Sequence, residues 1–259
     1  MRTLTFLPGI LLPAIALFFS AGCTKNLDYG SSDCRDCNIK NITWYQEYNG
    51  KLEDSIHYSF SYNILGNPVS IINDHVNTGN SLYYFFYDSH GRLSELIKSY
   101  SNGLYGTGPY DVWDRYGYNS KNEIILDTVY GFGSIIGGKP QPSDRYGYIS
   151  YTYDTKRRIS HEHGDFYIVG HYAYTLDYDY NYDAAGNLIT GAVYDNKLNL
   201  YRTNSVWMFL ARDYSVNNPF TATQYNDHYL PLRFSTNSFR LIPWAGAMNS
   251  YLKVEYWCR

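Results

Sequence analysis

Apolar and polar side chains alternate one by one through much of the chain. In SIHYSFSYN (55–63) the isoleucine, the phenylalanine and both tyrosines fall on one side of an extended chain, and the polar residues fall on the other. LDYDYNYD (176–183) repeats this pattern, with a row of tyrosines opposite a row of acids and an asparagine. A period of two is typical of β-strands that bury one face and leave the other in water. The acidic row therefore predicts a solvated sheet face rather than a cation site.

A short phrase recurs where these alternating segments end. In each copy a tyrosine is followed by Asp or Asn, and a turn-forming position comes four residues after the tyrosine. The chain is therefore built largely from one repeated unit. The copies begin at Tyr62, Tyr87, Tyr118, Tyr153, Tyr182 and, more weakly, Tyr225. The turn-forming position holds Gly66, Gly91, Asn122, Arg157, Gly186 or Tyr229.

The chemistry of a β-hairpin explains the phrase. The side chain of Asp or Asn accepts a hydrogen bond from the backbone two residues on, which starts a turn. Glycine, and less readily asparagine, adopts the left-handed conformation that closes a type I turn with a bulge. Arg157 and Tyr229 depart from the pattern. Their turns are either of another type or strained by about 1 kcal/mol.

We therefore predict an all-β fold: an antiparallel meander of repeated β-hairpins that forms a curved or partly barrel-like sheet. Alternate connections of a meander lie at opposite ends of the sheet. One end should carry the uniform turns, and the other should carry long loops rich in Gly and Pro. The stretch NSVWMFLARDYS (204–215) breaks the alternation. With Asn204 or Ser205 as its N-cap it predicts one short helix near 204–213, and a fully buried strand is the alternative.

The first 22 residues have the plan of a secretory signal peptide, with an early arginine, a proline-broken apolar run and small residues at the end. Those small residues precede Cys23 and resemble a bacterial lipobox, although Ser20 stands where leucine is usual. The resemblance implies that Cys23 is lipidated and anchors the protein in the cell envelope, most simply at the outer membrane. The alternative is an ordinary cleaved signal peptide followed by an incidental cysteine. Residues 23–39 then form a linker from the lipid anchor, and 40–259 form a single β domain.

Composition narrows the possible partners and chemistry. The chain has 31 tyrosines, 17% charged residues and a net charge of −3. Tyrosine favours half-buried strands, and the lack of a basic patch argues against a nucleic-acid partner. Export into an oxidising compartment predicts one structural disulfide. Cys34 pairs with Cys37, or one of these two pairs with Cys258; the sequence leaves both arrangements open.

Phrases such as YDAAGNLI (182–189) resemble the YD repeats of Rhs-type proteins. They are still more similar to the degenerate YD-like hairpins of small lipoproteins from Bacteroidota-type bacteria. The resemblance covers roughly residues 40–235 and implies a curved antiparallel sheet on the cell envelope. In Rhs proteins these repeats build a β shell around a toxin. This chain is too short for such a shell and lacks a toxin tail, so no activity is carried over.

Motifs of common enzymes are absent from the sequence, and we predict no catalytic residue and no cofactor. The segment HEHG (161–164) places His161 and His163 on one strand face as weak metal candidates. Without a third and fourth ligand they predict no metal site. Glu162 and Asp165 lie close by in sequence, as many pairs of acids do by chance.

The sequence predicts a noncatalytic lipoprotein that binds a glycan or another ligand through the loops at one end of the sheet. The alternative is a structural or assembly subunit of an envelope complex, and a glycan-active enzyme is the least favoured reading. The expected partners are the membrane, through the lipid anchor, and either a polysaccharide or another envelope protein. The candidates for stacking on a ligand are Tyr105, Tyr110, Trp113 and Trp244.

Overall fold

The computed structural model describes residues 37–49, 51–100, 108–235, 239–242 and 250–258. These residues form one antiparallel sheet of 14 strands, with a 3-10 helix η2 (Leu200–Thr203) and an α-helix α1 (Ser205–Ala211). The described part of the chain contains no helix with the length and apolarity needed to cross a membrane. The strands are β1 (Cys37–Tyr48), β2 (Lys51–Tyr62), β3 (Pro68–Asn73), β4 (Leu82–Tyr87), β5 (Leu93–Ser99), β6 (Gly108–Tyr118), β7 (Ile124–Ile136), β8 (Lys139–Pro140), β9 (Arg145–Tyr153), β10 (Ile159–Ile168), β11 (His171–Asp179), β12 (Gln224–Tyr225), β13 (Pro231–Ser235) and β14 (Ser250–Cys258).

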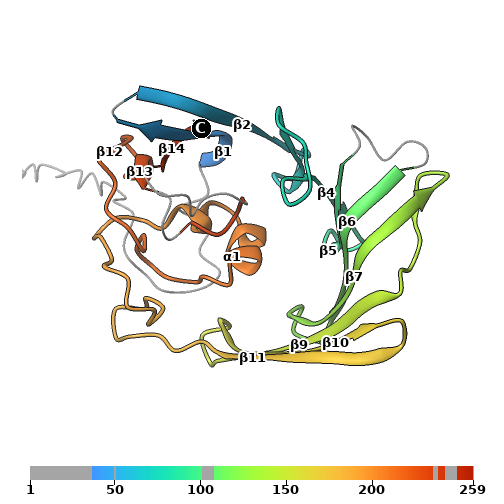
Figure 1. Cartoon of the computed structure of the whole chain (residues 1–259). Coiled ribbons are helices and arrows are strands. Elements are labelled where there is room, and N and C mark those ends of the chain that lie inside the picture. Colours follow the sequence, from blue (N-terminus) through green and yellow to red (C-terminus); the bar gives the residue numbers. More distant parts are fainter. Residues whose placement is uncertain (1–36, 50, 101–107, 236–238, 243–249, 259) are drawn as a thin grey trace, which may run out of the picture.

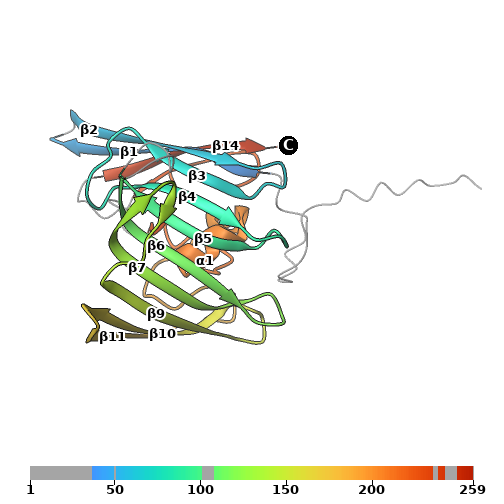
Figure 2. The same ribbon diagram turned by 90° about the vertical axis from the view of Figure 1, so that its right-hand side faces the viewer.

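The sheet is a curved meander that does not close into a barrel, which confirms the predicted fold class. Its strand order is β11-β10-β9-β7-β6-β5-β4-β3-β2-β1-β14-β13-β12, so β11 and β12 are the two edges. Figure 1 shows β1 and β2, then β4 to β7, then β9 to β11 curving around α1. The view in Figure 2 shows the strands of this wall side by side. The segment between β11 and β12 lies within the curve.

All six repeated turns adopt one geometry. In each turn the Asp or Asn after the tyrosine accepts from the backbone N–H four residues on, and in five of them also from the N–H two residues on, at 2.8–3.0 Å. The turn-forming residue is left-handed throughout, including Arg157 (φ 59°) and Tyr229 (φ 61°). These two turns are therefore of the common type and carry backbone strain.

The repeated tyrosine links one hairpin to the next. The hydroxyl of Tyr87 donates to the carbonyl of Pro68, the first residue of β3, at 2.7 Å. In the next two repeats the hydroxyls of Tyr118 and Tyr153 make the equivalent bonds. They donate to the carbonyls of Leu93 and Ile124, the first residues of β5 and β7, at 2.7 and 2.8 Å. Each bond satisfies a carbonyl beside the preceding turn. The tyrosine of the phrase thus positions neighbouring hairpins relative to each other.

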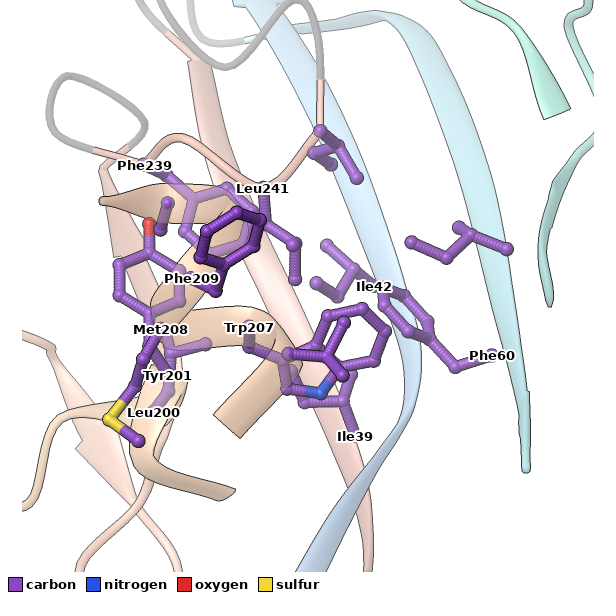
Figure 3. Packing of buried hydrophobic residues seen from close by; sticks show 14 of the residues in the cluster. Ile39, Ile42, Phe60, Leu200, Tyr201, Trp207, Met208, Phe209, Phe239 and Leu241 are labelled. Carbon is purple, nitrogen blue, oxygen red and sulfur yellow. The ribbon is translucent and has the colours of Figure 1, made fainter. Parts of the chain in front are cut away.

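The predicted helix is confirmed, and it is the centre of the core. The side chain of Asn204 caps α1 by accepting from the N–H of Val206, and its amide donates to the carbonyl of Gly66 at 3.0 Å. Trp207 is fully buried and lies edge-on to Phe60 and Phe85, with ring centroids 5.6 and 5.7 Å away. Figure 3 shows Trp207 against Phe60 and residues of β1. Because α1 has only seven residues, packing rather than intrinsic propensity holds it.

The loop end of the sheet differs from the prediction. Strands β6 and β7 extend far beyond their turn. The Gly- and Pro-rich segment GFGSIIGGKPQPSD (131–144), which by its composition belongs to the predicted long loops, is therefore largely a hairpin of β7 with β8. Tyr110 and Trp113 consequently lie within β6. The β10–β11 connection is a tight turn at Val169 and Gly170. The glycines and prolines had indicated loops, but long cross-strand pairing incorporates them.

The disulfide joins Cys37 to Cys258, one of the arrangements that the sequence left open. The two cysteines are cross-strand partners at the start of β1 and the end of β14. Cys34 lies outside the described residues, as do the predicted signal peptide and Cys23. Since β1 begins at Cys37, the sheet starts slightly before the predicted domain boundary at residue 40.

Substitution of Gly91 by alanine tests the left-handed turn. Gly91 has φ 72°, and an added Cβ would meet open space, so strain of the backbone is the main effect. We expect the free energy of unfolding to fall by about 1 kcal/mol, measured by urea denaturation. His90→Ala is the control, because its exposed side chain lies in the same turn and its removal should be near neutral. Equal midpoints for Gly91→Ala and the parent would contradict this geometry.

Candidate functional site

The predicted stacking residues are packed in the protein rather than open to a ligand. Tyr110 is 0% exposed and Trp113 is 7% exposed. Tyr130 stacks on Trp113 with ring centroids 5.0 Å apart, and the Trp113 indole donates to Glu95 Oε2 at 3.1 Å. Neither ring offers a free face for a ligand, which corrects the sequence-based expectation for these two residues. Tyr105 and Trp244 lie outside the described residues.

Exposed aromatic rings gather instead at the β11 edge. All nine residues of β11 are exposed except Leu176, because this strand has only β10 as a neighbour. Tyr172, Tyr174 and Tyr178 are 60%, 49% and 50% exposed. Alternation places Tyr174 and Tyr178 on one face of the sheet. This edge is the largest cluster of accessible tyrosines along one described strand.

The concave face of this edge carries an aromatic platform. Phe166 of β10 and Tyr174 of β11 are cross-strand partners with ring centroids 4.7 Å apart and an interplanar angle of 13°. Phe166 lies close to the backbone because two glycines leave room for its ring. A Cβ at Gly147 would lie 2.6 Å from the ring, and one at Gly164 would lie 3.0 Å from it. The glycines thus let the Phe166 ring lie close to the strands, and the half-exposed Tyr174 ring stacks on it.

The convex face of the same hairpin carries imidazoles and carboxylates. The register pairs His161 with Asp179 and His163 with Asp177. His161 Nδ1 lies 2.9 Å from Asp179 Oδ1, and His163 Nδ1 lies 2.8 Å from Asp177 Oδ2. The structure therefore places acidic partners beside the two histidines that the sequence singled out. His171 belongs to the same hairpin but not to this group.

A buried ion pair joins the end of α1 to the concave face. Arg212 Nε donates to Glu162 Oε2 at 2.9 Å, and another guanidinium nitrogen donates to the Tyr151 hydroxyl. Tyr180 donates to the same Glu162 oxygen at 2.9 Å. The guanidinium also lies over the Tyr151 ring, 4.6 Å from its centroid. A buried arginine paired in this way fixes α1 against β9 and β10.

Two further buried carboxyl groups lie near this pair, Asp114 of β6 and Asp127 of β7. Burial raises the pKa of Asp114, and the positive charges of Lys98 and Arg212 oppose the rise. Burial raises the pKa of Asp127 well above its usual range, and the charge of Asp114 adds to the effect. Asp127 Oδ1 accepts no hydrogen bond from the described residues. The geometry therefore favours a neutral, protonated Asp127.

The nearby positive charges are those of Lys98 and Arg212, and the carboxylate paired with Arg212 is that of Glu162. No local sequence pattern indicates this cluster, because its charged members lie far apart along the chain, on β5, β6, β7 and β10 and directly after α1. Glu162 lies within HEHG and Asp165 directly follows it, but the two lie on opposite faces of β10, since Glu162 points to Arg212 and Asp165 to His163.

Two groups among the described residues have donor atoms close enough to hold a metal ion. One consists of Cys37, Cys258 and His228, but its cysteines are joined in the disulfide. The other consists of His161, His163 and Asp177. The sequence alone did not indicate Asp177 as a member of this group, because only the β10–β11 register brings it to the histidines.

No known family model matches the chain, and no curated protein matches it in sequence.

Replacing Asp127 by asparagine tests its protonation. A carboxyl group whose pKa is higher in the folded state stabilises the fold below about pH 4, and that stability is lost as the pH rises toward the folded pKa. Asparagine does not titrate and keeps the shape. We expect Asp127→Asn to be more stable than the parent at pH 7, with the difference growing by about 1.4 kcal/mol per pH unit within that window.

Thermal unfolding from pH 4 to pH 8 measures this difference. The exposed Asp144→Asn variant, which makes the same substitution at a surface carboxyl group, is the control. An Asp127→Asn variant that is less stable at pH 7 would mean that Asp127 is ionised and held by the two cations.

Proposed function

We propose that this protein is a noncatalytic, lipid-anchored binding module of the cell envelope. We further propose that it takes a hydroxyl-rich ligand, such as a polysaccharide, on the concave face of the β11 edge. The observation that carries the proposal is the row of half-exposed tyrosines, Tyr174 and Tyr178, on a strand without an outer neighbour. Stacking of the ligand on aromatic side chains is the mode of binding that the sequence predicts, but the side chains belong to a strand rather than to the loops.

The physical chemistry of the edge suits a sugar chain. Tyrosine supplies a flat, rigid contact area at low entropic cost, and its hydroxyl remains available for hydrogen bonds. The Phe166 ring supports Tyr174, so the platform needs little ordering when a ligand binds. An open strand edge makes a shallow site, for which an affinity between micromolar and millimolar, about 4–8 kcal/mol, is reasonable.

Alanine substitution of the platform tests the proposal. We expect the Tyr174→Ala, Tyr178→Ala double variant to bind a polysaccharide at least about tenfold more weakly than the parent, a loss of about 1.4 kcal/mol. Affinity gel electrophoresis against a panel of neutral and acidic polysaccharides gives the comparison. Tyr229→Ala is the matched control, because Tyr229 is 61% exposed in the β12–β13 turn, near the other edge of the sheet.

Three results would contradict this function. An affinity that is unchanged in the double variant would place the site elsewhere. Turnover of any polysaccharide by the purified protein would refute the noncatalytic reading. Absence of binding across the panel, together with a co-purifying envelope protein, would favour the assembly alternative.

The anchor has its own test. The small residues before Cys23 support lipidation at that position. We expect Cys23→Ser to move the protein from the membrane fraction to the soluble fraction, since acyl chains on the cysteine provide the attachment. Fractionation followed by a high-salt wash measures the distribution, and Cys34→Ser is the control. A Cys23→Ser protein that stays with the membrane after the wash would refute lipid anchoring.

A further inference from the structure

The convex face of the β10–β11 hairpin brings two histidines and an acid to one point. Antiparallel pairing sets His161 and His163 of β10 opposite Asp179 and Asp177 of β11. Because side chains two residues apart share a face, all four side chains project from the same side of the sheet. The side chains of His161, His163 and Asp177 are 35%, 43% and 57% exposed, so a solute ion can reach them.

The donor atoms of three of these residues lie at separations that suit metal coordination. Asp177 Oδ2 is 2.8 Å from His163 Nδ1, and Asp177 Oδ1 is 3.6 Å from His161 Nε2. All three residues have ligand atoms within 4.8 Å of one another. Ligands at about 2.1 Å in a tetrahedral zinc site are about 3.4 Å apart, and the two measured separations bracket that value. Small side-chain rotations complete the geometry.

Each imidazole also has a carboxylate at its other nitrogen. His161 Nδ1 lies 2.9 Å from Asp179 Oδ1, and His163 Nε2 lies 3.5 Å from Asp165 Oδ2. The hydroxyl of Thr175 donates to Asp165 Oδ1 at 2.5 Å and orients that carboxylate. Carboxylates in this position fix the ring orientation of metal-bound histidines and raise their basicity. The arrangement therefore has both ligands and the groups that orient them.

We propose that His161 Nε2, His163 Nδ1 and the Asp177 carboxylate bind a divalent transition metal ion of the zinc type, with water completing the coordination. Imidazole ligands select zinc, nickel or copper over calcium and magnesium, which prefer oxygen. The three aspartates of the cluster give the face a negative charge that attracts a cation. With only three protein ligands on an exposed face, the site binds and releases the ion without being needed for folding.

This site is independent of the proposed ligand platform. The metal ligands lie on the convex face of the hairpin, and Tyr174 and Tyr178 lie on the concave face with Glu162. Loss of the metal site leaves the tyrosines in place, and loss of the tyrosines leaves the histidines in place. An experiment that refutes the metal site therefore leaves the proposed ligand platform standing, and the reverse also holds.

Calorimetric titration with zinc chloride tests the site. The protein is the untagged Cys23→Ser, Cys34→Ser chain, so that no affinity tag or unpaired cysteine competes for zinc. We expect one ion per chain and a dissociation constant in the micromolar range. We expect His161→Ala, His163→Ala and Asp177→Asn each to weaken binding at least tenfold. Asp179→Asn, which changes only an orienting carboxylate, should weaken it by about tenfold.

Matched controls come from the same chain. His171→Ala removes a histidine of the same hairpin that lies outside the cluster, and His228→Ala removes the histidine beside the disulfide. Both should bind zinc as the parent does, and millimolar magnesium or calcium should not displace the ion. Thermal unfolding of every variant without metal should match the parent, which separates lost binding from lost folding.

The proposal is overturned if zinc does not bind below millimolar concentration. It is also overturned if His161→Ala and His163→Ala bind zinc with the parent's affinity, or if only His228→Ala abolishes binding. Shifts of the His161 and His163 imidazole resonances on addition of zinc, with His171 unchanged, would support it directly.

Discussion

A curved sheet that does not close leaves an apolar concave face that has to be covered, and the rest of the structure follows from this constraint. The covering segment runs from the end of β11 to the start of β12 and carries α1. Its central residue, Trp207, is reached by aromatic side chains of β2 and β4. A helix of seven residues is stable there because the sheet surrounds it. The hydrophobic contribution of one fully buried large side chain, about 2–3 kcal/mol, exceeds what such a helix gains by itself.

The same constraint accounts for the buried charges. Where the covering segment leaves α1, Arg212 adopts a left-handed conformation (φ 53°) and turns into the sheet. Its charge needs partners away from water, and Glu162 and the Tyr151 hydroxyl provide them. Asp127 lies in the same low-dielectric region without a hydrogen-bond donor for one oxygen. The covering segment is thus held at two places, by the apolar packing of Trp207 in α1 and by the ion pair of Arg212 directly after it.

The local features were predictable from the sequence, and the long-range ones were not. The repeated tyrosine–Asp/Asn unit specified the turns, because the hydrogen bonds that the Asp or Asn side chain accepts span only four residues. These bonds impose the same geometry even where the turn-forming residue is Arg157 or Tyr229. The cap and the apolar run of α1 are local in the same sense. The burial of Tyr110 could not be predicted from neighbouring residues in the sequence. It depends on how far β6 and β7 pair and on Gly133, where a Cβ would lie 2.1 Å from the Tyr110 hydroxyl.

The candidate sites were predictable only in part, because they depend on local alternation and also on long-range strand pairing. Alternation correctly separated the tyrosines of LDYDYNYD from its acids, and it put His161 and His163 on one face. Only the hairpin register adds that the acids of one strand face the histidines of the other. The same row of charges explains how β11 remains exposed as an edge, because charged side chains discourage another strand from pairing with it. The register of this single hairpin thus creates two surfaces, with tyrosine rings of β11 on the concave side and, on the convex side, the histidines of β10 opposite the acids of β11.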